Sequence, residues 1–402
     1  MAYVAPRRAV STATSVTINA DAPSPLLTAA NAASSNTFTS FIQNSFWERV
    51  THSLAGSYPP GNFYDCNVGE DGANASGHTH LDYGGKWCYY PGNGAAGTRK
   101  AAFMANGANP VGSTIRIYSH VWNTLAIYDE ASNTWSTQRG VKAPNEGADP
   151  DCIVHILHNN TIDYTTGILY KKKFRGTDEI LRYNLLTDTM LNTIPTAVGI
   201  EPNAYSHDGA MEFIPTRGAS GALWLHCVDR NTDRPMLAEY NIATGVWSSI
   251  VASGASTFGT GTTTATYCMS YNPRAFSGAG GVLCGNGNGA FKVNCSTLAV
   301  SSAGTPPQSL IPANGLKLCA DPVSDGWYYS STTTGYLYRC NGTTWTQIIQ
   351  LPSNLATPGN TYPSVLCPIH AEGSNYGVIW ILAGQLPSHG ATNGMASWLY
   401  KP

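Results

Sequence analysis

A pair of bulky apolar residues, seven positions apart around a short polar turn, recurs along this 402-residue chain. The five copies are Tyr128/Trp135, Tyr183/Met190, Tyr240/Trp247, Val293/Val300 and Tyr338/Trp345. The intervals between the first residues of successive copies give a repeating unit of about 50 residues. Two short β-rich runs around a polar turn are the pattern of a hairpin. A repeat of this length built from hairpins predicts a β-propeller, in which each unit forms one sheet.

Further strands are expected upstream of each hairpin. A run led by glycine precedes it, as in residues 221–224 (GALW) and 377–380 (GVIW). An earlier run ends at a turn rich in Asp, Pro and Gly, as in residues 210–214 (AMEFI) before Pro215. Short runs bounded in this way predict strands and reversals. We therefore expect an all-β propeller of six four-stranded blades, with seven blades as the alternative because residues 51–100 are poorly patterned.

The last unit has no fourth strand, because the sequence ends directly after its third expected strand. A matching segment lies at the other end of the chain, where Phe46 and Trp47 stand in a run similar to the outer strands of the other units. We expect this segment to pair with the strand that holds Trp398 and Tyr400. An N-terminal strand would then close the ring and leave no open edge.

The chain is predicted to have two parts, an extended N-terminal arm over residues 1–43 and a propeller over residues 44–402. The arm is rich in Ala, Ser, Thr and Asn, and prolines interrupt it. Such an arm either stays disordered or orders against a partner or a neighbouring subunit. Val16, Thr17 and Ile18 could add to the edge of another chain's sheet as a strand.

Charge is scarce in this chain, with 11% charged residues and a net charge of -2 at pH 7. No basic stripe is present that could neutralise a run of phosphates, so nucleic acid is not expected as a direct partner. No apolar run is long enough for a membrane span, and the N-terminus lacks the apolar segment of a secretory signal. The ten cysteines form no CxxC pair, which predicts buried thiols, with a Cys284–Cys295 disulfide as the alternative.

Residues 77–82 (GHTHLD) hold the best candidate for a metal site. On a strand, His78, His80 and Asp82 would share one face, and imidazoles with a carboxylate suit zinc. The glycines around them favour a loop without a fixed face, so an incidental cluster is the alternative. No catalytic or nucleotide-binding fingerprint occurs elsewhere. We therefore predict no catalytic residues, no cofactor and no enzymatic activity.

Glu212 is expected on the inner strand of the third unit. A carboxylate buried there needs a partner, and Arg217, Arg230 and Arg234 are the candidates that we consider.

The hairpins and glycine-led second strands resemble those of the kelch and galactose-oxidase-type propellers over roughly residues 46–402. The chain departs from the kelch pattern, since Lys171, His226 and Ser330 stand near positions where that family has a double glycine. The copper site of the oxidases does not map onto the chain. Within the resemblance, the chain is most similar to propeller proteins of tailed bacteriophages, which carry inner strands like residues 207–213 (HDGAMEF).

This resemblance implies a non-enzymatic bacteriophage virion protein, head- or tail-associated and attached through its N-terminal arm. It also implies other virion proteins as partners, a symmetric oligomeric assembly and location in the virion. Two alternatives remain, a receptor-binding module that recognises host-surface glycan and a carbohydrate-active enzyme. Exposed aromatic residues beside Asn and Asp would suit sugar binding, whereas an enzyme would need two carboxylates close together at the channel mouth.

Overall fold

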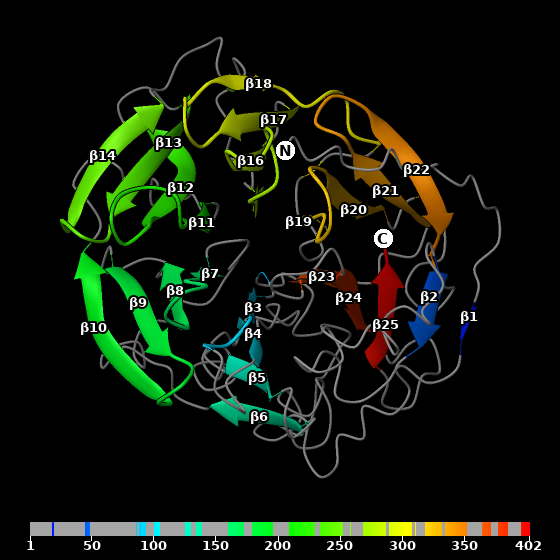
Figure 1. Ribbon diagram of the computed structural model, residues 1–402, viewed down its shortest axis with the longest axis horizontal. Helices are drawn as coiled ribbons and strands as arrows, with labels where there is room; N and C mark the ends of the chain where they lie inside the picture. Colours follow the sequence, from blue (N-terminus) through cyan, green and yellow to red (C-terminus); the bar gives the residue numbers. More distant parts are fainter. Residues whose placement is uncertain are drawn as a thin grey trace, which may run out of the picture.

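The computed structural model shows a ring of sheets (Figure 1). The residues that the structure describes are 18–19, 45–48, 86, 88–93, 100–104, 125–129, 134–138, 160–172, 179–195, 209–229, 234–251, 258, 268–286, 289–307, 310, 318–331, 334–351, 364–370, 377–384 and 395–402. These residues form six sheets. A helix long and apolar enough to cross a membrane does not occur among them.

Five of the sheets are regular blades, each made of four antiparallel strands that follow one another along the chain. Their strands are β3 (Cys88–Tyr90), β4 (Lys100–Met104), β5 (Leu125–Asp129) and β6 (Thr134–Gln138); β7 (Asn160–Ile162), β8 (Ile168–Lys172), β9 (Glu179–Asn184) and β10 (Thr189–Pro195); β11 (Ala210–Ile214), β12 (Ala222–Asp229), β13 (Arg234–Asn241) and β14 (Val246–Val251); β15 (Cys268–Asn272), β16 (Gly281–Asn286), β17 (Gly289–Asn294) and β18 (Val300–Ser302); and β19 (Leu318–Ala320), β20 (Trp327–Ser331), β21 (Tyr336–Cys340) and β22 (Trp345–Gln350).

The remaining sheet is composite, because both ends of the chain contribute to it. Its strands, from the inside outwards, are β23 (Ser364–His370), β24 (Gly377–Gly384), β25 (Met395–Lys401), β2 (Ser45–Glu48) and β1 (Ile18–Asn19). The N-terminal β2 runs antiparallel to β25, with Phe46 opposite Tyr400 and Glu48 opposite Trp398. It takes the position of the fourth strand that the last unit lacks (Figure 1).

The innermost strands of the six sheets contact one another in a closed cycle, from β3 through β7, β11, β15, β19 and β23 back to β3. Figure 1 shows the sheets arranged around this centre, with the later strands of the five regular blades further out, and with β2 and β1 outermost in the composite sheet. The prediction of an all-β propeller is therefore confirmed. The prediction of six four-stranded blades is corrected to five such blades, because the remaining sheet has five strands and draws on both ends of the chain; a seventh sheet does not occur in the part of the chain that the structure describes.

The seven-residue spacing marks the hairpin that ends each regular blade. In four copies the two residues pair directly across the hairpin: Tyr128 with Trp135, Tyr183 with Met190, Tyr240 with Trp247 and Val293 with Val300. In the fifth copy the register differs, since Trp345 pairs with Cys340 and Tyr338 lies opposite Gln347. The last pair of this hairpin, Cys340 and Trp345, encloses four residues, as Asn241 and Val246 do, but the turn begins one residue further from the tyrosine. Its Gly342 has a φ of 94°, which glycine adopts readily.

In two of these hairpins the tryptophan also bonds to the preceding sheet. The indole N–H of Trp247 donates to the carbonyl of Pro195 at 3.0 Å, at the end of the outer strand of the preceding sheet. Trp345 repeats the contact with the carbonyl of Ala303, also at 3.0 Å, just after β18. Trp247 and Trp345 therefore each belong to the outer hairpin of one sheet and bond to the sheet before it.

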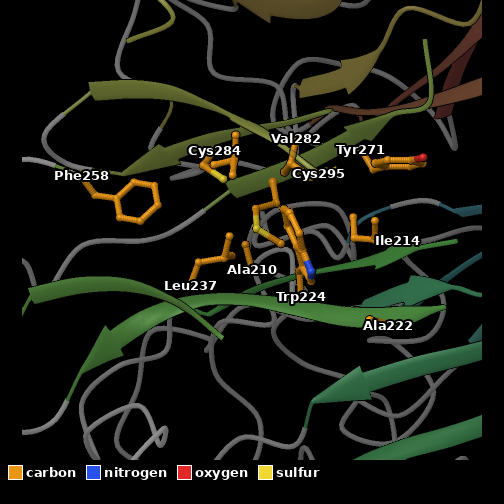
Figure 2. Close-up of a cluster of buried hydrophobic side chains, with 12 residues drawn as sticks. Ala210, Ile214, Ala222, Trp224, Leu237, Phe258, Tyr271, Val282, Cys284 and Cys295 are labelled. Carbon is orange, nitrogen blue, oxygen red and sulfur yellow. The ribbon is translucent and has the colours of Figure 1, made fainter. Parts of the chain in front are cut away.

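The core lies between neighbouring sheets. Figure 2 shows one such layer, in which Trp224 and Leu237 of one blade meet Cys284 and Cys295 of the next. Cys284 and Cys295 are buried, and no disulfide joins them, so the alternative of a bond across this hairpin is wrong. The described cysteines are all buried thiols, as the sequence predicts. Burial raises the pKa of the Cys295 thiol to about 12.

Replacing Trp345 by Phe tests the contact between blades. The substitution Trp345→Phe keeps a ring against Tyr329, 6.1 Å away between centroids, but removes the indole donor. We expect a loss of about 1 kcal/mol in the free energy of unfolding, measured by urea denaturation, because the Ala303 carbonyl loses a partly buried hydrogen bond.

The matched control is Trp247→Phe. Its hydrogen bond to Pro195 is exposed, so water replaces it and the loss should stay below about 0.5 kcal/mol. No loss in Trp345→Phe would show that this bond does not stabilise the contact between blades, and an equal loss in Trp247→Phe would show that exposure does not weaken it.

Candidate functional site

A cavity of about 40 Å³ lies on the axis of the propeller, where the innermost strands converge. Every sheet contributes at least one residue to its wall: Cys88 of β3, Tyr164 after β7, Glu212 of β11, Ser270 of β15, Cys319 of β19 and Leu366 of β23. Because an axial site draws on all six sheets, residues far apart in the sequence meet there. This is the position in the fold where a small ligand would touch the most elements.

Glu212 is the carboxylate of this site, and it is only 1% exposed. Its Oε1 accepts a hydrogen bond from the backbone N–H of Tyr271 at 2.9 Å and forms an ion pair with Lys86. Its Oε2 accepts a hydrogen bond from the hydroxyl of Thr161 at 3.1 Å. Burying a charge without partners costs several kcal/mol, and here three partners from three other parts of the chain offset that cost.

Thr161 continues the polar contacts into the sheets. Its hydroxyl oxygen accepts a hydrogen bond from the backbone N–H of Phe213 at 3.0 Å, while its proton is donated to Glu212. Inner strands β7 and β11 are thus joined by a side chain where a propeller has no continuous sheet. With the Tyr271 contact, Glu212 connects its own blade to the blades on both sides.

Lys86 supplies the positive charge. Its side chain is 10% exposed and faces Glu212, yet the ammonium has no hydrogen-bond partner of regular geometry among the described residues. An ammonium carries three N–H donors, so the ion pair leaves donors available on the cavity side. The hydroxyl of Tyr271 in the same wall is also buried without a hydrogen-bond partner of regular geometry among the described residues, but Lys86 is the one of the two that carries a charge.

Asn160 holds Lys86 in place. The backbone N–H of Lys86 donates to Asn160 Oδ1 at 2.9 Å, and Asn160 Nδ2 donates to the backbone carbonyl of Lys86 at 2.5 Å. The amide therefore binds both backbone groups of Lys86 in the way that a neighbouring strand would. Since Asn160 is fully buried, the lysine backbone is fixed between the first and second blades.

The wall of the cavity has two different sides. Lys86 and Glu212 make one side polar, and they lie with the blades of β3 and β11. Leu318 of β19 and Leu366 and Pro368 of β23 form an apolar side. The apolar residues come from two consecutive inner strands, so they form one continuous arc of the ring.

Two thiols in the wall are poor nucleophiles. Burial raises the pKa of Cys88 to about 12, although Lys86 nearby acts in the opposite direction. Burial also raises the pKa of Cys319 well above its ordinary value. The thiolate is the reactive form of cysteine, so chemistry at this site depends on Lys86 and Glu212.

The residues predicted from the sequence fall in different places. His78, His80 and Asp82 lie outside the described residues, as do Val16 and Thr17. No cluster of three or more His, Cys, Asp or Glu residues able to hold a metal occurs in the described part of the chain.

The other predicted residues lie in the composite sheet. Phe46 and Trp47 are in β2, and Trp398 and Tyr400 are in β25, which pairs with it. Ile18 is in β1 and runs parallel to β2 of the same chain, opposite Phe46.

Sequence reasoning singled out Glu212 but considered the wrong partners for it. The partner is Lys86, while Arg217 instead pairs with Glu239, with Nε 2.7 Å from Oε2. Lys86 stands in a poorly patterned stretch, and no motif marks it. The signal that was available is the need of a buried carboxylate for a cation, which does not say which cation is used.

Comparison with known proteins gives limited information. No family model matches the chain, and no curated protein matches it. Among solved structures, a regucalcin from Agrobacterium tumefaciens, described as a calcium-binding protein, has a TM-score of 0.44 and 12% identity over 81% of this chain and 96% of its own. A gluconolactonase from Xanthomonas campestris has a TM-score of 0.44 and 11% identity over 80% of this chain and 86% of its own. These values bear on the fold alone.

Two sequence-based predictions are corrected at this point. The bacteriophage virion assignment is dropped, because these similar structures are a calcium-binding protein and a gluconolactonase, and the kelch likeness matches no family model. The prediction of no enzymatic activity is dropped as well, since one of these structures is an enzyme. The partners and the location that followed from the virion assignment stay predictions that nothing in the structure tests.

Replacing Asn160 tests whether it positions Lys86. In Asn160→Ala the Lys86 backbone loses two buried hydrogen bonds. We therefore expect the free energy of unfolding to fall by about 2 kcal/mol. We also expect Lys86 to become reactive towards acetic anhydride, measured by mass spectrometry after brief labelling. Lys171 and Lys172, each 6% exposed, should stay protected in the same sample.

The matched control is Asn184→Ala, which removes a turn-capping amide at the outer hairpin and should leave Lys86 protected. Labelling of all three lysines together would mean general loosening, and unchanged labelling of Lys86 would mean that Asn160 does not position it.

Proposed function

We propose that the protein binds a small polar molecule in the axial cavity, held by the ammonium of Lys86. The observation that carries this proposal is a cation that is nine-tenths buried, that borders a cavity, and that keeps N–H donors without acceptors in the described structure. A buried donor left without an acceptor costs free energy, and an occupant of the cavity that accepts a hydrogen bond removes that cost.

The size of the cavity limits the occupant. A volume of about 40 Å³ admits about three water-sized groups. A ligand with about four non-hydrogen atoms gains at most about 6 kcal/mol, which corresponds to a dissociation constant of roughly 40 µM at best. Binding experiments should therefore use millimolar probe concentrations.

We also propose that the composite sheet serves as the sixth blade of a kelch-like ring formed by residues 44–402. Support comes from the closed cycle of inner strands and from the place of β2 outside β25. The axial site depends on this arrangement, because Leu366 and Pro368 in its wall belong to the composite sheet. The wall of the cavity is then complete only when the composite sheet is in its place in the ring.

Ligand-observed NMR tests the binding proposal, with ethylene glycol, acetamide and acetate as probes at millimolar concentration. We expect at least one probe to bind, and Lys86→Met to weaken its binding at least about tenfold, since about 1.4 kcal/mol of hydrogen bonding is lost. The charge-matched control is Lys292→Met, because Lys292 lies on β17, with its Nζ 5.7 Å from the centre of the Phe276 ring and outside the cavity wall.

A double variant covers the case in which Lys86→Met unfolds. Lys86→Met with Glu212→Gln removes both charges, so no uncompensated charge remains buried, and it should also fail to bind. If no probe binds to the wild-type protein, or if binding persists without Lys86, the proposal is wrong.

A further inference from the structure

The polar groups of the axial cavity limit the chemistry of its occupant. A carboxylate has about four acceptor positions, and three of those on Glu212 are taken by Tyr271, Lys86 and Thr161. The remaining position is on Oε2, which accepts only the Thr161 hydroxyl among the described residues. Lys86 offers donors beside it. A group that accepts one hydrogen bond and donates another satisfies both sides, and a hydroxyl does both.

The net charge of the cavity wall further restricts the chemical class of the ligand. Lys86 and Glu212 neutralise each other, and the other residues of the cavity wall carry no charge: Cys88, Tyr89, Tyr164, Ser270, Tyr271, Leu318, Cys319, Leu366 and Pro368. The two wall cysteines stay protonated, because burial raises the pKa of each. A carboxylate or an ammonium entering this cavity would be a buried charge without a partner, which is strongly unfavourable. The occupant is therefore neutral.

The apolar arc supplies the third constraint. Leu318, Leu366 and Pro368 lie on the neighbouring inner strands β19 and β23, whereas Glu212 lies on β11. They offer no hydrogen bonds through their side chains, so a ligand that is polar on all sides would lose contacts with water there without replacing them. A short aliphatic group fits that side of the wall.

From these three constraints we propose that the axial cavity is a site for a small neutral aliphatic alcohol. Its oxygen accepts a hydrogen bond from Lys86, its hydroxyl proton is donated to Glu212 Oε2, and its alkyl part lies against the leucines and the proline. The inference rests on the proposed binding function and adds the chemical class of the ligand. Binding is reversible and no bond is made or broken.

Four probes of similar size test the class. They are propan-1-ol, acetate, propylamine in its ammonium form, and tetrahydrofuran, which accepts a hydrogen bond but does not donate one. Each is titrated separately into the full-length protein at neutral pH, with dissociation constants from ligand-observed NMR. We expect propan-1-ol to bind at least tenfold more tightly than each of the other three. That preference should vanish in Lys86→Met and persist in Lys292→Met.

The outcomes separate the ligand class from the binding function. Binding of acetate through Lys86 at least as tight as that of propan-1-ol would overturn the alcohol class and leave the binding function standing. Equal binding of tetrahydrofuran and propan-1-ol would remove the role given to Glu212 and overturn the class in the same way. If none of these probes binds, and ethylene glycol and acetamide also fail, both proposals fall and water is the occupant.

Discussion

The carboxylate of Glu212 is buried where the inner strands of the propeller meet, and the need to compensate its charge organises the axis around it. Lys86 provides the opposite charge, and Tyr271 and Thr161 provide hydrogen bonds. These partners belong to different blades, so the same contacts that make the buried charge tolerable also join sheets that share no backbone hydrogen bonds. Asn160 extends this set by fixing the backbone of the lysine.

The outer part of the ring depends on contacts of another kind. There the blades pack through apolar layers, and the indole N–H groups of Trp247 and Trp345 reach the preceding sheet. In the composite sheet, β2 pairs with β25 and so joins the two ends of the chain. The axis is where the inner strands of all six sheets meet, and this explains why the candidate site, which every sheet helps to line, is found there.

The architecture could be predicted from the sequence because it repeats. The pairing of Tyr240 with Trp247 is local, and its spacing is visible in one hairpin. The match between the segment at Trp47 and the incomplete last unit led to the placement of β2. The exception is the hairpin at Trp345, where the turn begins one residue further from the tyrosine and the register changes although the spacing is kept. The spacing alone does not determine where the turn begins.

The site could not be predicted in the same way, because its residues meet across the ring. Glu212 was expected to need a cation, yet the arginines considered for it came from its own unit, and Arg217 has a different carboxylate partner. Lys86 comes from a poorly patterned segment, and it reaches Glu212 because the inner strands β3, β7 and β11 follow one another around the axis. The functional prediction failed for a related reason. It relied on the resemblance of the repeats to those of other propellers, and the repeats determine the blades but not the residues that line the axial cavity.

A double-mutant cycle between Lys86 and Glu212 tests the central claim, that this ion pair organises the axis. Lys86→Met, Glu212→Gln and the double variant are compared with the wild-type protein by urea denaturation. The account predicts that each single change costs about 3 kcal/mol or more, since it leaves a buried group without its partner, and that the double change costs at least about 1.5 kcal/mol less than the sum. Costs that add to within about 0.5 kcal/mol would contradict it, because the two residues would then be independent.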